Sequence, residues 1–116
     1  MWVFTQDGFI SAVDNNQVPG KLAVRARDKA SLDLLSTMSG EEIVQLENTD
    51  YPYRVFVTKE QFSDFLLAQV EDLDYGNFKN RVYDTRGKAY SYACGRVWEA
   101  MLAVTDDEAV GTGLYS

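Results

Sequence analysis

Short segments in which apolar and polar residues alternate constrain the fold most strongly. In a β-strand successive side chains point to opposite faces, so this alternation indicates strands with one buried face. Two of the segments are separated only by the turn Gln6-Asp7-Gly8, in which glycine supplies the positive φ of a hairpin. Because short turns join such strands, the sequence predicts an antiparallel sheet of about four to five strands. The segments are 2–5, 9–13, 21–27, 43–46 and 53–57.

Apolar residues spaced three and four apart indicate helices between and after these strands. Asp28 can cap a helix that runs to Ser39 and ends at Gly40. Thr58 and Gln61 form a capping box, which begins a second helix. We expect helices over 29–39, 59–73, 78–82 and 88–104. The predicted fold is therefore α+β, with the helices packed on one face of the sheet. Residues 1–104 would form a single α+β domain, and residues 105–116 a flexible acidic, glycine-containing tail.

Length and charge agree with one small globular domain. The chain has 116 residues, and its 11 basic and 18 acidic side chains give a net charge of −7. No apolar run approaches the roughly 18 residues of a membrane span. The first residues lack the basic and apolar regions of a secretory signal. We therefore expect a cytoplasmic protein without membrane association.

The residues that most enzymes use are scarce. The chain has no histidine, which removes the commonest general base and the usual activator of serine or cysteine nucleophiles. Its one cysteine, Cys94, cannot form an internal disulfide and lies in a helical apolar pattern typical of a buried thiol. None of the glycines forms a phosphate-binding loop. The sequence therefore predicts no catalytic residue, no metal site and no cofactor, and hence no enzyme.

The strands themselves carry the clearest candidate for binding. If the valines of segments 21–27 and 53–57 face the helices, the alternate residues point to the open face of the sheet. Guanidinium groups and an aromatic ring on a bare sheet could bind nucleic acid or another protein, although the net charge of −7 repels a polyanion. In the alternative interpretation the arginines pair with nearby carboxylates and keep the face hydrated. The residues concerned are Arg25, Arg27, Arg54 and Phe56.

Further candidates lie at element boundaries and on the last helix. Asp50-Tyr51 and Asp74-Tyr75 place aromatic rings where the chain turns, and such rings either anchor protein interfaces or cover the ends of a core. The last helix is apolar almost all round, which indicates a central core helix or a homodimer contact made by Trp98 and Leu102. The additional candidate residues for partner binding are Tyr51, Tyr75, Phe78, Lys79 and Trp98.

Five motifs in a fixed order resemble those of a family of small bacterial and bacteriophage proteins with no assigned activity. They are GFISAV at 8–13, VRAR at 24–27, DYPYR at 50–54, NFK at 77–79 and VW at 97–98. The resemblance implies a phage or bacterial accessory protein. It also implies that Arg25, Arg27, Arg54 and Lys79 act together.

From these observations we expect a non-catalytic binding protein. Its partner would be another protein, such as a host factor if a phage encodes the chain, and a homodimer is a further expectation. A nucleic-acid or nucleotide binder that uses the open sheet face is the first alternative. An acidic inhibitor that mimics DNA is the second.

Overall fold

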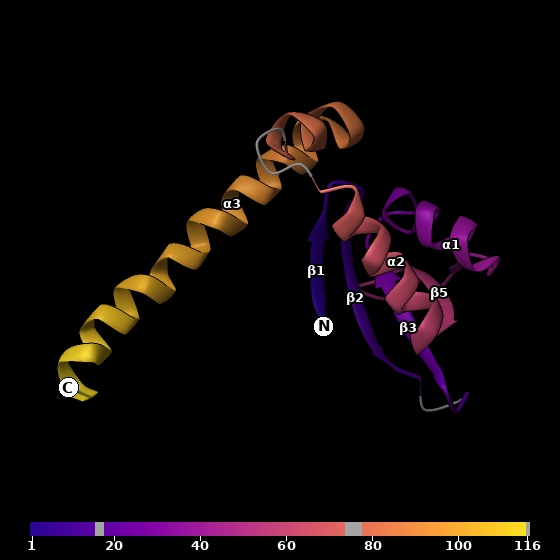
Figure 1. Ribbon diagram of the computed structural model, residues 1–116, viewed down its shortest axis with the longest axis horizontal. Helices are drawn as coiled ribbons and strands as arrows, with labels where there is room; N and C mark the ends of the chain where they lie inside the picture. The colour runs from indigo at the N-terminus through magenta and orange to yellow at the C-terminus, as the bar shows by residue number, and fades with distance from the viewer. Residues whose placement is uncertain (16–17, 74–77, 116) are drawn as a thin grey trace.

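The chain forms a five-stranded antiparallel sheet with helices around it, as the computed structural model shows (Figure 1). The structure describes residues 1–15, 18–73 and 78–115, and of residues 78, 79 and 106–115 it describes the backbone alone. The strands are β1 (Trp2–Thr5), β2 (Gly8–Asp14), β3 (Lys21–Ala26), β4 (Val44–Gln45) and β5 (Tyr53–Thr58). Their order in the sheet is β1-β2-β3-β5-β4. The prediction of an α+β fold with an antiparallel sheet is confirmed.

Two helices and a short 3-10 turn connect and follow the strands. The 3-10 turn η1 (Ala30–Leu32) leads into α1 (Asp33–Ser39), which ends at Gly40 in the left-handed conformation with φ 75°. Helix α2 (Lys59–Glu71) begins with the expected capping box, in which Thr58 Oγ1 accepts from the Gln61 amide and the Gln61 side chain accepts from the Thr58 amide. Local sequence signals therefore set both helix boundaries.

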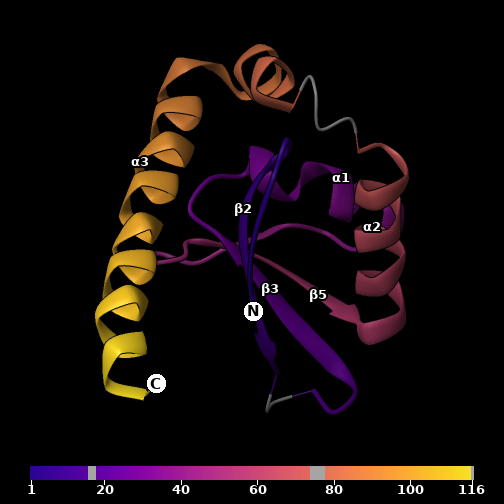
Figure 2. The ribbon, with the colours of Figure 1, turned by 60° about the vertical axis from the view of Figure 1, so that its left-hand side comes forward.

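One face of the sheet and the helices α1 and α2 enclose the core. Ala12 on β2, Val24 on β3 and Val55 on β5 lie in register across three strands, and all three side chains are buried. Leu35 of α1 and Phe65 of α2 pack into the same cluster. Figure 2 shows α1 and α2 on one side of the sheet. The predicted packing of helices on one face is correct for these two.

Helix α3 (Phe78–Tyr115) departs from the expected arrangement. Its backbone leaves helical geometry at Gly87, which has φ 84° and ψ −177°. The first part is anchored by Val82, which is buried, whereas the part after Gly87 extends away from the sheet (Figures 1 and 2). The helix continues to Tyr115 instead of ending at Val104, and it is not a core helix. Within the described residues, no helix combines the length and apolar character needed to cross a bilayer.

Candidate functional site

The sheet face opposite α1 and α2 carries the arginines. Arg25 on β3 is paired with Arg54 on β5, and Ser11 on β2 is paired with Arg25 on its other side. Since Val24 and Val55 are fully buried on the helix face, their neighbours Arg25, Arg54 and Phe56 point to the other face. The predicted sidedness is confirmed for these strand residues. Arg27 lies just beyond the end of β3.

Tyr51 covers two of these guanidinium groups. The chain between β4 and β5 places its ring beside the sheet face, with the ring centroid 4.5 Å from Arg25 Cζ and 5.0 Å from Arg27 Cζ. Cation–π attraction of this kind holds the guanidinium planes in place. Arg25 Nη2 also donates to Ser11 Oγ at 2.8 Å. The face is therefore partly covered by Tyr51 and is not wholly bare. We call Arg25, Arg27, Arg54 and Tyr51 the arginine cluster.

Within the part of the chain that the structure describes, no carboxylate forms an ion pair with the arginine cluster. Arg27 donates to the backbone oxygen of Asp50, and Arg54 donates to Thr49 Oγ1 at 3.4 Å. The Nε atoms of Arg25 and Arg54 are buried without a hydrogen-bond partner. The interpretation in which neighbouring carboxylates neutralise these arginines is therefore wrong for the described residues. The carboxylates of the described ion pairs lie elsewhere and bind Lys21, Arg81, Arg86 and Arg96.

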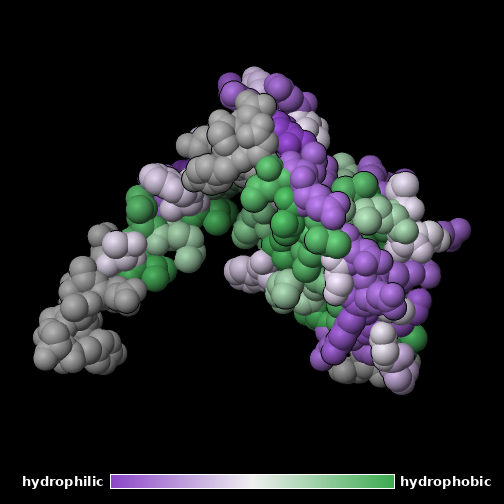
Figure 3. Space-filling model, viewed as in Figure 1, coloured by the Kyte–Doolittle hydropathy of each residue, from purple (hydrophilic) through white to green (hydrophobic). Residues whose placement is uncertain are grey.

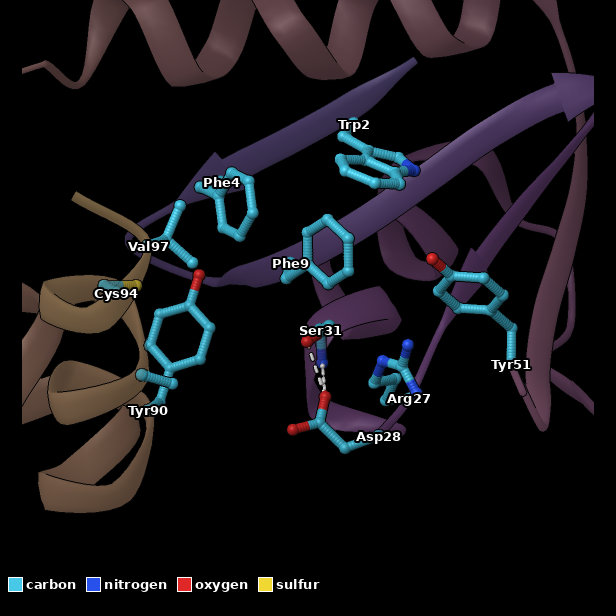
Figure 4. A pocket seen from close by; sticks show the side chains of 11 residues that line it. Trp2, Phe4, Phe9, Arg27, Asp28, Ser31, Tyr51, Tyr90, Cys94 and Val97 are labelled. Carbon is cyan, nitrogen blue, oxygen red and sulfur yellow. Dashed lines mark hydrogen bonds between the residues drawn. The ribbon is translucent and has the colours of Figure 1, made fainter. Parts of the chain in front are cut away.

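An aromatic groove adjoins the arginine cluster on the same face. Phe4 of β1 and Phe9 of β2 stack with centroids 4.5 Å apart, and Trp2 meets the edge of Phe9. Figure 4 shows these rings between α3 on one side and Tyr51 with Arg27 on the other. The groove has a volume of about 440 Å³. We define the aromatic groove by Trp2, Phe4, Phe9, Tyr90, Cys94 and Val97, which line it.

Hydrogen bonds from the start of α3 close one end of the groove. Arg86 forms an ion pair with Asp28 and donates to Ser31 Oγ at 3.1 Å and to the backbone oxygen of Asp7 at 2.6 Å. Tyr90 donates to the backbone oxygen of Thr5 at 2.8 Å, and burial raises the pKa of this phenol. These contacts fix where α3 leaves the body of the protein.

We call the contacts of Arg86 with Asp28, Ser31 and Asp7 the anchor of α3. Because Asp28 is ionisable, the stability that this anchor contributes depends on pH. Burial acts to raise the pKa of Asp28, but hydrogen bonds from Ser31 and the charge and hydrogen bond of Arg86 outweigh it, so the pKa lies below its ordinary value. A lowered pKa means that ionised Asp28 stabilises the fold above the carboxyl group's unfolded pKa, and that this contribution is lost as pH falls through the folded pKa.

We therefore expect the difference in unfolding free energy between wild type and Asp28→Asn to shrink from pH 6 to pH 2. Because half of the Asp28 side chain is exposed, the difference at pH 6 should be about 1 kcal/mol or less. Urea denaturation at several pH values measures it. Asp64→Asn removes an exposed carboxylate of α2 that lies outside this contact, and it serves as the control. A constant difference for Asp28→Asn would contradict the assignment of the anchor.

The other predicted site residues are only partly brought together. Tyr51 joins the arginines, and Phe56 lies on the same sheet face. Trp98 lies on α3 beyond the groove and is 69% exposed. Tyr75 lies outside the described residues, as do the side chains of Phe78 and Lys79.

Sequence reasoning missed the aromatic residues of β1 and β2 as part of the site. Trp2, Phe4 and Phe9 follow the same alternation that identified the arginines, so the pattern on β1 and β2 could have placed them on the open face. No local pattern in the sequence indicated that these rings line the same groove as Tyr90 and Val97 of α3.

The described residues hold no group of three or more Cys, Asp or Glu side chains arranged to bind a metal ion. Comparison of the chain with protein-family models, with curated proteins and with solved structures finds no match. The resemblance to the bacterial and bacteriophage family stays a prediction.

Proposed function

We propose that the protein is a non-catalytic binding protein that recognises carboxylate groups of a protein partner through the arginine cluster. The observation that carries this proposal is the cross-strand pair Arg25–Arg54, with Arg27 nearby and no ion-paired carboxylate among the described residues. Like charges directly opposite each other destabilise a sheet, and a bound anion would remove that cost. Guanidinium groups match the geometry of a carboxylate, because they donate two parallel hydrogen bonds.

The aromatic groove adds the apolar contact that a protein interface needs. Phe9 lies 6.4 Å from Tyr51 between ring centroids, so the arginine cluster and the groove form one continuous surface. Interfaces between proteins are rich in aromatic residues and arginine, and their energy comes from a few such anchors. An apolar segment that carries an acidic side chain would satisfy both parts of this surface.

A protein partner suits the charge of the chain better than nucleic acid does. A net charge of −7 repels a polyanion over long distances. A single acidic side chain of a protein partner interacts mainly with the guanidinium groups next to it, because salt screens the more distant charges. The same charge, spread over 116 residues, is modest for a protein that imitates DNA. In phage or bacteria, a protein of this kind would act as an accessory factor on another protein.

Fluorescence anisotropy with labelled probes tests the proposal. The probes are a peptide of Leu and Glu, the same peptide with Lys in place of Glu, and a single-stranded oligonucleotide. We expect the acidic peptide to bind most tightly and to weaken with salt. The variant Arg25→Ala, Arg27→Ala, Arg54→Ala should bind it at least about tenfold more weakly, since removing a charge-assisted hydrogen bond costs about 1.5–3 kcal/mol.

A matched control removes three cations elsewhere on the surface. Lys59→Ala, Lys88→Ala, Arg96→Ala has the same net charge as the arginine variant, and all three residues are exposed. This control should keep most of the affinity. If the two variants bind the acidic peptide equally, the arginine cluster is not the site. If the oligonucleotide binds more tightly than the acidic peptide, the nucleic-acid alternative replaces the proposed function.

A further inference from the structure

The part of α3 that follows Gly87 exposes a continuous apolar stripe. Every described side chain from Trp98 to Thr105 is exposed, with Trp98 at 69% and Met101 at 58%. Met101 and Leu102 follow Trp98 by three and four positions, so these three exposed residues share one side of the helix. We call these three residues the α3 stripe. A helix that keeps such a stripe in water loses the burial that usually stabilises it.

The molecule as a whole exposes more surface than a folded monomer of its mass. Its accessible surface is 8179 Å², whereas a monomer of 13.1 kDa exposes about 6,400 Å². Its radius of gyration is 16.5 Å, compared with about 13 Å for a compact domain of this length. The excess is about 1,800 Å², and it agrees with the extension of α3 away from the body of the protein (Figure 1).

Two grooves with many apolar side chains flank β1. The aromatic groove borders one side of β1, and a second groove borders the other, lined by Val3, Leu66, Val70 and Leu73. Phe4 lines both. Figure 3 shows hydrophobic residues on α3 and on the body facing it, with a hollow between them.

From these observations we infer that the protein forms a homodimer in which the α3 stripe of each copy fills the aromatic groove of the other. A stable interface of standard size buries about 800 Å² per partner, which is less than half of the excess surface of about 1,800 Å². The arrangement is self-complementary, as a two-fold dimer requires, because each chain has one stripe and one groove.

A second copy fits the groove better than the chain's own α3. Arg86 and Tyr90 tie the start of this helix to the body, and residues after Gly87 continue as one helix. Since Tyr90 is held at Thr5, closing the rest of α3 onto its own sheet would require a bend within the helix. A helix from another copy needs no such bend.

The chemistry of the two surfaces also matches. From Val97 to Val104 the only charged residue is Glu99, which lies on the side of the helix away from Met101. The groove is likewise apolar, with Arg27 and Asp28 at its end. The arginine pair on β3 and β5 lies further across the sheet, beyond β2. This dimer goes beyond the proposed binding function and leaves Arg25 and Arg54 uncovered. It occupies the aromatic groove, however, so the apolar segment of a partner competes with the second copy there.

Sedimentation equilibrium of the full chain between 1 and 100 µM tests the inference, and we expect twice the monomer mass of 13.1 kDa. Met101→Lys places a charge in the stripe and should raise the dimer dissociation constant at least about tenfold. Ala103→Lys places the same charge on the opposite side of the helix and should leave the constant unchanged within about twofold. The variant Arg25→Ala, Arg54→Ala, at two residues that do not line the aromatic groove, should dimerise as the wild type does, which separates this test from that of partner binding.

A second measurement does not depend on a stripe variant. The wild-type chain has two tryptophans, Trp2 in the aromatic groove and Trp98 in the α3 stripe, and we expect acrylamide to quench their fluorescence less at 100 µM than at 1 µM. A monomer at 100 µM, or a dimer that Met101→Lys does not weaken, would overturn the inference. Quenching that is the same at both concentrations would overturn it as well.

Discussion

Replacing Gly8 with alanine should destabilise the protein by about 3 kcal/mol, because it combines a strained backbone with an overpacked site. Gly8 begins β2 with φ 150°, a conformation that residues with a Cβ rarely adopt. A Cβ atom there would overlap Ser31 Oγ and would lie 2.6 Å from Arg86 Nη1. Both atoms belong to the anchor of α3, so neither can move without loosening it. Urea denaturation at a fixed protein concentration measures the change.

Gly20 provides the control that separates these two causes. It also has a positive φ, 83°, but no atom lies within 4 Å of the place a Cβ would take. Gly20→Ala should therefore cost about 1 kcal/mol, the penalty of the backbone conformation alone. If both variants lowered the free energy of unfolding equally, the close approach of Gly8 to Ser31 and Arg86 would contribute nothing to stability.

Replacing Phe65 with alanine should cost about 3–5 kcal/mol, the range for removing a large aromatic side chain from a core. Phe65 is 1% exposed and packs near Phe62 of α2, with ring centroids 6.2 Å apart. It is the largest fully buried side chain of the described core, between α2 and the sheet. Its loss leaves a cavity that the surrounding strands cannot fill by relaxation. Urea denaturation reports the effect.

Leu67, two positions along the same helix, is the matched control. It is 54% exposed, so Leu67→Ala keeps the helix and removes little buried surface. Its cost should stay within about 0.5 kcal/mol, as for other surface substitutions. A loss for Phe65→Ala no larger than that for Leu67→Ala would contradict the placement of the core between α2 and the sheet.

The strands and the sidedness of the arginines followed from alternation along the chain. Period-two spacing of valines and arginines on β3 and β5 is a local property, and it predicted which side chains share a face. The end of α1 and the start of α2 were equally local, because Gly40 and the capping box of Thr58 and Gln61 act within one turn of the helix. The expected helix over 29–39 instead begins with the 3-10 turn Ala30–Leu32, and the helix expected over 59–73 ends at Glu71.

The composition of the candidate site depended on contacts that no local pattern contains. Tyr51 covers Arg25 only because the chain between β4 and β5 turns back over the sheet. The sequence allowed the arginines to pair with carboxylates, since the chain has 18 acidic side chains. The fold instead directs the described carboxylate partners to Lys21, Arg81, Arg86 and Arg96.

The sequence by itself determined the number and type of most elements, the face on which Arg25 and Arg54 lie, and the apolar character of the last helix. Only the tertiary structure decided that Phe9 and Tyr51 meet beside those arginines, and that α3 leaves the sheet after Gly87. The physical reason is that periodicity records which side of an element avoids water. What covers that side is decided by contacts between residues far apart in the chain, such as Arg86 with Asp28.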